Sequence, residues 1–390
     1  MTPALAQANS QANSQWNANI APEPQIVIVG GGIAGAALAT ALARAGRQVL
    51  VLESTDVFRD RVRGESMMPW GVAEAQCLGL MDLLRAAGAH TAPLWKRYSE
   101  GDAVPRDLPV GRFIPGVGGS LNLHHPIACQ ALLDAAAAAG ASVIRGVRKV
   151  SVVPGVNPTV CFELAGIVKT VAPSLVVGAD GRGSVVRRCA GIELQQQEAS
   201  AYVAGLLLEG VAGSDGHDTV MEHELGVCLL IRQTGARARA YHIVPTEHRT
   251  RYAGDGGAQR FLADATGPGS PLSAVLADAQ PIGPCGAVPG TDTWTDRPYA
   301  EGMVLIGDAA GHNSPSVGCG HSRSRRPAQR TPKALRPGHG DHGQKYLPNH
   351  VRHVCRPRDH PRPSRQRRRV GPHPCRLINI GNDLLRVRAK

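Results

Sequence analysis

Short apolar runs and a stretch rich in alanine and leucine alternate near the start of the chain. Residues 25–29 form a β-branched run that is followed by glycine, residues 33–44 are rich in Ala and Leu, and residues 48–52 form a second apolar run. Short apolar runs are typical of buried strands, and the longer stretch is typical of a helix. The order strand, turn, helix, strand therefore predicts a βαβ unit that opens a parallel sheet.

The same reasoning predicts further elements of this first part. Helices are expected over residues 69–84 and 128–139, and buried strands over residues 142–144 and 171–177. The pattern then changes, because apolar segments begin to follow one another with Gly-rich turns between them. This change indicates a second kind of sheet in the middle of the chain.

The middle segments predict an antiparallel sheet inserted into the parallel one. Residues 201–208, 227–231 and 238–244 look like successive strands, and residues 301–306 return to the short apolar pattern. We therefore predict an α/β fold with a discontinuous, Rossmann-like parallel sheet and an inserted antiparallel-sheet domain. The expected parts are a disordered N-terminus (1–22), a nucleotide-binding domain (23–190 plus 291–320), a substrate-covering sheet domain (191–290) and a disordered basic tail (321–390).

Composition limits what the core and the cellular context can be. A chain of 390 residues can bury a full core in two or three domains, and its 4% aromatic content means that Ala, Val and Leu must build that core. Nine scattered cysteines without CxxC spacing argue against a disulfide framework or a zinc site, so a reduced, cytoplasmic protein is expected. The N-terminus lacks the pattern of a signal peptide, and no apolar run is long enough to predict a membrane span.

The net charge of +12 is confined to the tail. Residues 321–390 contain 16 Arg and 3 Lys against 3 Asp, which leaves 24 basic and 28 acidic residues in the rest of the chain. A mildly acidic body does not have the electrostatic pattern of a nucleic-acid-binding domain, and no specific nucleic-acid partner is expected.

A glycine cluster follows the first predicted strand. Gly30 permits a tight turn, Gly32 lets a pyrophosphate approach the backbone, and Gly35 lets helix and strand pack closely. Ile33 and Ala34 open the helix, so that phosphates would lie at free N–H groups of a positive helix terminus. The pattern predicts a dinucleotide-binding turn.

Acidic residues at three predicted strand ends extend this motif. Glu53 ends the second strand, where its carboxylate can accept ribose hydroxyls. The first motif alone does not decide between FAD and NAD. Two further clusters bear on that choice, because Asp180 and Asp308 each follow another apolar run and are flanked by glycines.

With the three clusters in this order, residues 25–320 resemble the flavoprotein aromatic hydroxylases, the group that includes p-hydroxybenzoate hydroxylase and its epoxidase, reductase and halogenase relatives. An isolated GxGxxG is weak evidence, whereas three such elements at these separations are strong. The resemblance implies FAD as the cofactor. Gly307 and Asp308 look like the pair whose aspartate hydrogen-bonds the ribityl hydroxyls, and Asp180 resembles the aspartate whose loop touches both the flavin and the nicotinamide cofactor, although an Asp-Gly pair after a strand can also be a simple turn.

Other positions are implied by the same resemblance. Pro315 would lie against the isoalloxazine, and Gly318 belongs to the glycine pattern that continues the third cluster. Arg63 occupies the segment where such enzymes bring an arginine to the flavin, with an ordinary surface charge as the alternative. Where relatives often have an arginine that opens the helix after the third strand, this chain has His125, which leaves the adenosine side less well defined.

The resemblance implies an FAD-dependent, NAD(P)H-using monooxygenase. Reduced flavin would react with O2 to give a C4a-hydroperoxide that hydroxylates an aromatic or polyketide-like small molecule. The alternatives are a flavin-dependent reductase or dehydrogenase and an inactive, truncated flavoprotein. Catalytic residues and the oligomeric state are not identified, and Arg232, Tyr241, His242 and His223 are the candidates for substrate contacts in the inserted domain. The tryptophan-rich segment with an isolated lysine that marks halogenases is not visible.

The tail departs from the family after Gly320. It contains 9 Pro and 7 His among its 70 residues and has no amphipathic stretch before residue 377. An Arg-rich nucleic-acid arm, a natural disordered extension and a reading-frame change near Gly320 remain open. The abrupt junction favours the frame change, because Arg, Pro, His and Gly dominate out-of-frame translation of GC-rich genes, and sequencing the gene across the junction tests it.

Overall fold

The computed structural model describes residues 24–313 except 61, 63, 200, 214, 215 and 284. Three of the predicted site residues, Arg63, Pro315 and Gly318, lie outside the described residues. The same holds for the predicted disordered N-terminus, residues 1–22, and for the basic tail, residues 321–390.

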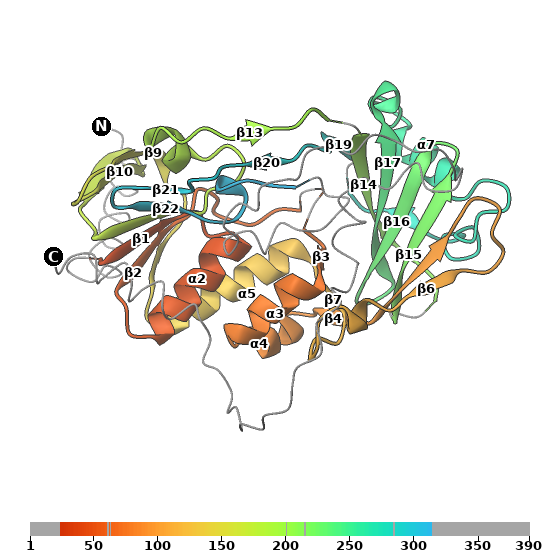
Figure 1. Cartoon of the computed structure of the whole chain (residues 1–390), viewed down its shortest axis with the longest axis horizontal. Helices are drawn as coiled ribbons and strands as arrows, with labels where there is room; N and C mark the ends of the chain where they lie inside the picture. The colour runs from red at the N-terminus through yellow and green to blue at the C-terminus, as the bar shows by residue number, and fades with distance from the viewer. Residues whose placement is uncertain are drawn as a thin grey trace, which may run out of the picture. The chain divides into compact units, whose positions relative to one another are not determined.

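A six-stranded sheet forms the first layer, in the order β21-β22-β12-β1-β2-β8 (Figure 1). Five strands are parallel and β21 pairs antiparallel at one edge. The strands are β1 (Ile26–Val29), β2 (Val49–Leu52), β8 (Ser142–Ile144), β12 (Leu175–Gly178), β21 (Tyr299–Ala300) and β22 (Met303–Leu305). Because β22 arrives from the far end of the described chain, the parallel sheet is discontinuous, as the sequence predicted.

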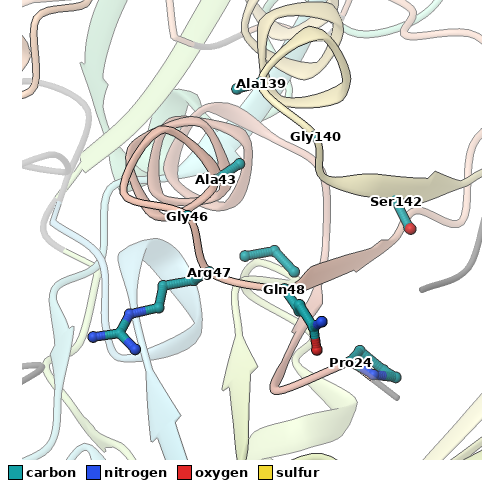
Figure 2. Close-up of a pocket in the computed structure, with 9 residues that line it drawn as sticks. Pro24, Ala43, Gly46, Arg47, Gln48, Ala139, Gly140 and Ser142 are labelled. Atoms are coloured by element: carbon teal, nitrogen blue, oxygen red, sulfur yellow. The ribbon is translucent and has the colours of Figure 1, made fainter. Parts of the chain in front are cut away.

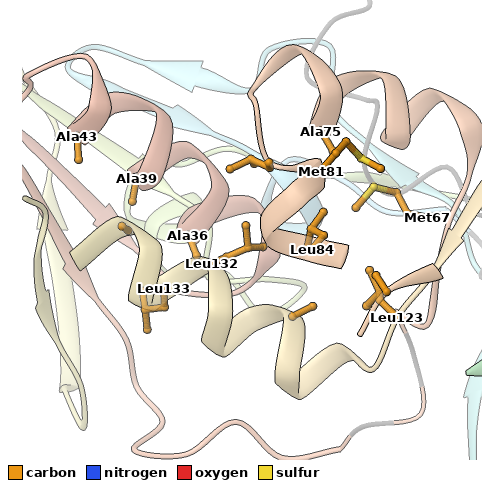
Figure 3. Close-up of a cluster of buried hydrophobic side chains, with 14 of the residues drawn as sticks. Ala36, Ala39, Ala43, Met67, Ala75, Met81, Leu84, Leu123, Leu132 and Leu133 are labelled. Atoms are coloured by element: carbon orange, nitrogen blue, oxygen red, sulfur yellow. The ribbon is translucent and has the colours of Figure 1, made fainter. Parts of the chain in front are cut away.

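Helices cover one face of this sheet. Strand side chains such as Val51 and Val177 pack against α2 (Ile33–Arg44) and α5 (His125–Ala138), with α3 (Pro69–Cys77) and α4 (Met81–Ala86) beside them. Figure 3 shows that small alanines of α2 meet leucines of α5 in this core. The small side chains let the two helices approach closely, and the Thr40 hydroxyl donates a hydrogen bond to the Leu132 carbonyl at 3.0 Å.

The opposite face of the parallel sheet is covered by a β-meander and a short helix. Residues of β9 (Arg148–Val153), β10 (Thr159–Leu164), β11 (Ile167–Val171) and α6 (Val185–Cys189) pack against it. Both faces of the parallel sheet are therefore covered, and the side chains of its central strands are buried whichever face they point to. This explains the uninterrupted apolar sequences of these strands. The meander was not predicted, although β10 has the alternation of buried and more exposed residues that is typical of a half-buried strand.

A second, larger sheet has the order β18-β14-β17-β16-β15-β5-β6, with β19 also pairing β14. The predicted strands of the inserted region are confirmed as β14 (Ala201–Glu209), β16 (Gly226–Gln233) and β17 (Arg237–Pro245), and β15 (His217–His223) was missed. The remaining strands are β5 (Leu94–Tyr98), β6 (Arg106–Leu108), β18 (Gln280–Pro281) and β19 (Gly286–Pro289). Strands β5 and β6 come from the range expected for the nucleotide domain, and the domain boundaries themselves stay a prediction.

Short elements connect these layers. Helix α7 (Gly257–Ala265) packs its Phe261 into a core on one face of the larger sheet. The other elements are β3 (Ser66–Met67), β4 (His90–Ala92), β7 (Ser120–Asn122), β13 (Gln195–Gln196), β20 (Thr293–Trp294) and the 3-10 turns η1 (Val110–Arg112), η2 (Thr246–His248) and η3 (Gly307–Ala309).

Glycine and proline explain where element boundaries differ from the prediction. The helix expected over residues 69–84 is divided into α3 and α4, because Gly79 adopts a φ of +63° that ends the first of them. Helix α5 begins at His125 rather than at residue 128, with Pro126 in its first turn, a position that proline favours. The strand expected over residues 171–177 is divided between β11 and β12.

Candidate nucleotide-binding site

The first glycine cluster forms a turn that larger residues cannot make. Gly30 has a φ of +104°, and a Cβ there would overlap the Ala179 backbone of the neighbouring strand end. A Cβ on Gly35 would overlap the Gly30 carbonyl oxygen, so these two glycines allow α2 to pack against β1. At Gly32 a Cβ would meet no atom within 4 Å, which leaves open space at the N-cap of α2.

The N-terminus of α2 has the features of a phosphate site. No side chain caps this helix, and its first turn contains Ile33 and Ala34 and no acidic residue. The first N–H groups of a helix have no partner within the helix, and they attract anions together with the helix dipole. Open space at Gly32 directly before these groups fits a pyrophosphate.

Glu53 lies beside this turn at the end of β2, and its position is fixed by hydrogen bonds. The Gly31 N–H donates to Oε2 at 2.6 Å, while the Thr55 N–H and hydroxyl both donate to Oε1 at 2.8 Å. The side chain is buried, with 7% of the residue exposed. Oε1 also accepts the Ser54 hydroxyl at 3.4 Å, so the remaining capacity to accept a ribose hydroxyl lies at Oε2.

The carboxylate of Asp180 holds the loop after β12 in place. Its Oδ2 accepts the N–H groups of Val185 and Val186 at 2.6 and 3.2 Å, and its Oδ1 accepts the Ser184 hydroxyl. These bonds cap the N-terminus of α6. The described contacts thus give Asp180 a structural role, and the predicted contact of its loop with the cofactors stays a prediction.

The third cluster lies against the first two. Gly307 follows β22 with a φ of +58°, and a Cβ there would lie 3.0 Å from Ala34 in the first turn of α2. Asp308 Oδ2 lies 3.5 Å from Arg182 Nε, and 32% of the Asp308 side chain is exposed. Arg187 connects the two loops, because its Nη1 donates to the Ala309 carbonyl at 3.0 Å and its Nη2 to the Arg182 carbonyl at 2.8 Å.

The three clusters therefore meet at one edge of the parallel sheet. They follow the carboxyl ends of β22, β12, β1 and β2, which are consecutive strands of the sheet. Ligands of open α/β sheets bind at this edge. The structure brings together Gly30, Gly32, Gly35, Glu53 and Asp308, and this set of free amides, open space and carboxylates fits a dinucleotide.

A hollow of about 210 Å³ lies elsewhere and takes no part in this arrangement. Figure 2 shows it beside the C-terminal ends of α2 and α5, near Ala43 and Ala139, and at the starts of β2 and β8. This is the amino edge of the sheet. The hollow is therefore separated from the candidate site by the length of the strands.

One face of the larger sheet carries a buried polar cluster that the sequence did not reveal. Arg239 Nε donates to Glu65 Oε1 at 3.1 Å, Arg239 Nη2 donates to both Asp60 oxygens at 2.6 and 2.7 Å, and the Tyr241 hydroxyl donates to Glu65 Oε2. Burial raises the pKa of Glu65, and the cation of Arg239 opposes that rise. The cluster connects the segment after β2 to β17.

Of the four proposed substrate contacts, only Tyr241 lies on this face. His242 points to the opposite face, where its Nε2 lies 3.1 Å from the Phe261 carbonyl and its ring stacks on Tyr252. Burial lowers the pKa of His242 to about 4, so it is a neutral core residue. His223 packs edge-on against His242, and Arg232 donates to the Ala212 carbonyl at 2.6 Å. The described contacts give these three residues structural roles, and a contact with substrate stays a prediction for them.

Within residues 24–313, no helix is long and apolar enough to cross a membrane. In the same part of the chain, no group of three or more His, Cys, Asp and Glu side chains is arranged to hold a metal ion.

Comparison with known proteins finds one family and several relatives. Residues 23–324 match the family described as FAD binding domain. Squalene monooxygenase SE1 of Panax ginseng is 36% identical over 101 residues, which make up 26% of this chain and 19% of that protein. Squalene monooxygenase of Rattus norvegicus is 41% identical over 68 residues, or 17% of this chain and 12% of that protein. The matches thus span about a fifth or less of these curated relatives.

Solved structures share the fold over most of the described chain. The myxobacterial chondrochloren halogenase CndH superposes with a TM-score of 0.67 and 20% identity, covering 77% of this chain and 71% of that one. PqsL of Pseudomonas aeruginosa superposes with a TM-score of 0.64 and 20% identity, covering 77% of this chain and 82% of that one. These likenesses confirm the predicted combination of a parallel sheet and an inserted antiparallel sheet.

Proposed function

Because this chain belongs to the FAD-binding-domain family of flavoprotein oxidoreductases, we propose that it is an FAD-dependent monooxygenase that uses NAD(P)H and O2 to oxygenate a small, largely apolar molecule of aromatic or polyketide type. The observation that carries the proposal is the meeting of three glycine-containing clusters at the carboxyl edge of four consecutive strands. A single cluster would fit many nucleotides. Three of them fit an extended dinucleotide.

The first and third clusters, together with Glu53, would hold the cofactor. The free amides at the start of α2, with Ile33 and Ala34, would bind the pyrophosphate, and the Glu53 carboxylate would accept the ribose hydroxyls. Asp308 would accept the ribityl hydroxyls from the opposite side of the sheet edge. The bound flavin would supply the oxygen chemistry, while the protein supplies binding, orientation and exclusion of water.

Aliphatic side chains lie beside the Arg239–Glu65 cluster on the same face of the larger sheet, and we propose that the substrate binds against them. Val203, Ile231 and Tyr241 share that face with the partly buried side chains of Leu229 and Ile243. Aliphatic side chains favour an apolar substrate through burial of surface, and they supply few hydrogen bonds for a charged one. The names of relatives such as squalene monooxygenase are in keeping with an oxygenation of an apolar molecule.

The proposal is tested in two steps on the purified full chain. The first is the visible spectrum, in which bound oxidised flavin absorbs near about 375 and 450 nm, a property of the cofactor. A protein that is colourless and does not take up added FAD would refute it. The second is NAD(P)H oxidation in the presence of candidate substrates, with ¹⁸O2 and mass spectrometry of the products. Incorporation of one ¹⁸O atom supports a monooxygenase, and reduction of the substrate without O2 consumption would instead identify a reductase.

A further inference from the structure

Arg145 lies directly beside Glu53 at the edge of the parallel sheet. Strand β8 ends at Ile144, whose carbonyl accepts the Glu53 N–H at 2.8 Å, and the Val147 N–H donates to the Glu53 carbonyl at 3.2 Å. The chain therefore leaves β8 next to the residue that would hold the ribose. Arg145 is the first residue after this strand.

Three contacts fix the guanidinium of Arg145. Its Nε donates to the Thr55 carbonyl at 3.0 Å, and its Nη1 donates to Gln130 Oε1 at 2.7 Å. Its Cζ lies 4.5 Å from the ring centroid of Phe58, a cation–π contact. The side chain is thus held by the loop after β2, by α5 and by an aromatic ring.

One donor of this fixed guanidinium has no partner. Nη2 of Arg145 is buried and makes no hydrogen bond within the described residues. A buried charged donor without an acceptor costs free energy, and native proteins rarely leave one unsatisfied. An orphaned donor on a residue whose strand end pairs with that of Glu53 points to an acceptor supplied by a ligand.

His125, the residue expected on the adenosine side of the site, contacts other protein residues. His125 stands where related enzymes often have an arginine, but its ring lies against Gly64 and within 3.6 Å of Cys129 Sγ. A Cβ on Gly64 would lie 2.5 Å from the His125 ring, so the contact is close. Arg145 is a fixed cationic donor on this side of the sheet edge.

We propose that Arg145 is a positioning residue for the adenosine half of the cofactor, whose Nη2 donates to a ring nitrogen or ribose oxygen of adenosine next to Glu53. The assignment to adenosine follows from the position of Arg145 in the sheet. Arg145 and Glu53, the residue proposed to hold the ribose, follow the neighbouring strands β8 and β2. Asp308, the residue proposed to hold the ribityl chain, follows β22 on the other side of β1. The inference rests on the proposed binding of FAD. It predicts that Arg145 distinguishes nucleotides by their adenosine moiety.

The test compares three ligands, FAD, ADP and FMN, and uses the full chain freed of nucleotide. ADP contains the adenosine without the flavin, and FMN contains the flavin without the adenosine. Arg145→Ala is expected to weaken FAD and ADP binding roughly ten- to a hundredfold, the usual effect of losing a hydrogen bond from a charged group, and to leave FMN binding unchanged. Isothermal titration calorimetry measures ADP binding, and quenching of flavin fluorescence measures the other two.

Two matched variants separate recognition from structural support. Arg148→Ala removes an exposed arginine that donates to the nearby Ser54 carbonyl, and it is expected to leave all three affinities unchanged. Gln130→Ala removes an Arg145 partner but keeps the free Nη2, so ADP affinity is expected to fall less than in Arg145→Ala. Thermal unfolding without ligand shows whether any variant has lost its fold.

The possible results are distinct. Equal ADP affinity in wild type and Arg145→Ala, equal losses for FMN and ADP, or no ADP binding by the wild type would each overturn the inference. ADP binding that depends on Arg145 without FAD binding would support the inference and refute the proposed function. Binding of FAD that does not depend on Arg145 would do the reverse.

Discussion

Asp218 is a buried carboxyl whose ionisation should control stability. It lies on β15 with no exposed surface, and its Oδ1 accepts the Asn122 side-chain amide at 2.7 Å and the Arg232 N–H at 3.0 Å. Its Oδ2 and the Asn122 Oδ1 are both buried without a partner among the described residues. Burial raises the pKa of Asp218 from 3.8 to about 7.

The raised pKa fixes the direction of the pH dependence. The unfolded chain releases the proton near pH 3.8, whereas the folded protein keeps it up to about pH 7. The folded state therefore binds more protons in this window, and stability falls as the pH rises from about 4 to about 7. At about 1.4 kcal/mol per pH unit, the contribution lost is on the order of 4 kcal/mol.

The perturbation is Asp218→Asn, which keeps the shape and removes the ionisation. Urea unfolding at pH 5, 6, 7 and 8 and constant ionic strength measures the free energy of unfolding for wild type and variant. We expect the free energy of unfolding of the wild type to fall relative to that of Asp218→Asn from pH 5 to about pH 7 and to level off by pH 8. Asp107→Asn, at an exposed position of β6, is the control and should run parallel to the wild type. Parallel profiles for wild type and Asp218→Asn would refute the reasoning.

Three further predictions concern the site. Gly35→Ala should prevent FAD binding and destabilise the fold by about 3 kcal/mol or more, because the new Cβ overlaps the backbone. Gly32→Ala should weaken FAD binding but leave the melting temperature of the nucleotide-free protein unchanged. Equal losses of melting temperature in the two variants would contradict this prediction. Arg187→Ala should weaken FAD binding about tenfold by separating two loops, while Arg188→Ala, whose hydrogen bond stays within one loop, should not, as measured by flavin fluorescence. Tyr241→Phe should cost about 1–3 kcal/mol in urea unfolding by removing a donor to buried Glu65, and a loss below about 0.5 kcal/mol would contradict the hydrogen bond.

Local sequence was sufficient for the nucleotide turn and insufficient for the contacts around it. The strand, the glycines and the helix of residues 26–44 follow one another directly in the chain. Their order alone therefore predicts the nucleotide-binding turn. The contact between Glu65 and Arg239 joins residues 174 positions apart, and no local pattern shows it. The orphaned donor of Arg145 likewise depends on the register of β8 beside β2.

The strand expected over residues 238–244 was confirmed as β17, but its sequence did not reveal the environments of its two faces. Tyr241 and His242 are adjacent and necessarily point to opposite faces. Sequence does not reveal which face α7 covers, and α7 itself was not predicted. The helix places Phe261 against His242, so that a candidate for substrate binding is a core residue.

The order of strands in the parallel sheet has a consequence for synthesis of the protein. Strand β1 pairs with β2 at once, but its other neighbour, β12, follows about 150 residues later, and β22 follows later still. At roughly 5–20 residues per second, the ribosome leaves one apolar edge of β1 unpaired for roughly 7 to 30 seconds. Unpaired apolar edges are prone to aggregate. Yield in a heterologous host should therefore depend on chaperones that bind nascent chains and on the speed of translation between β2 and β12.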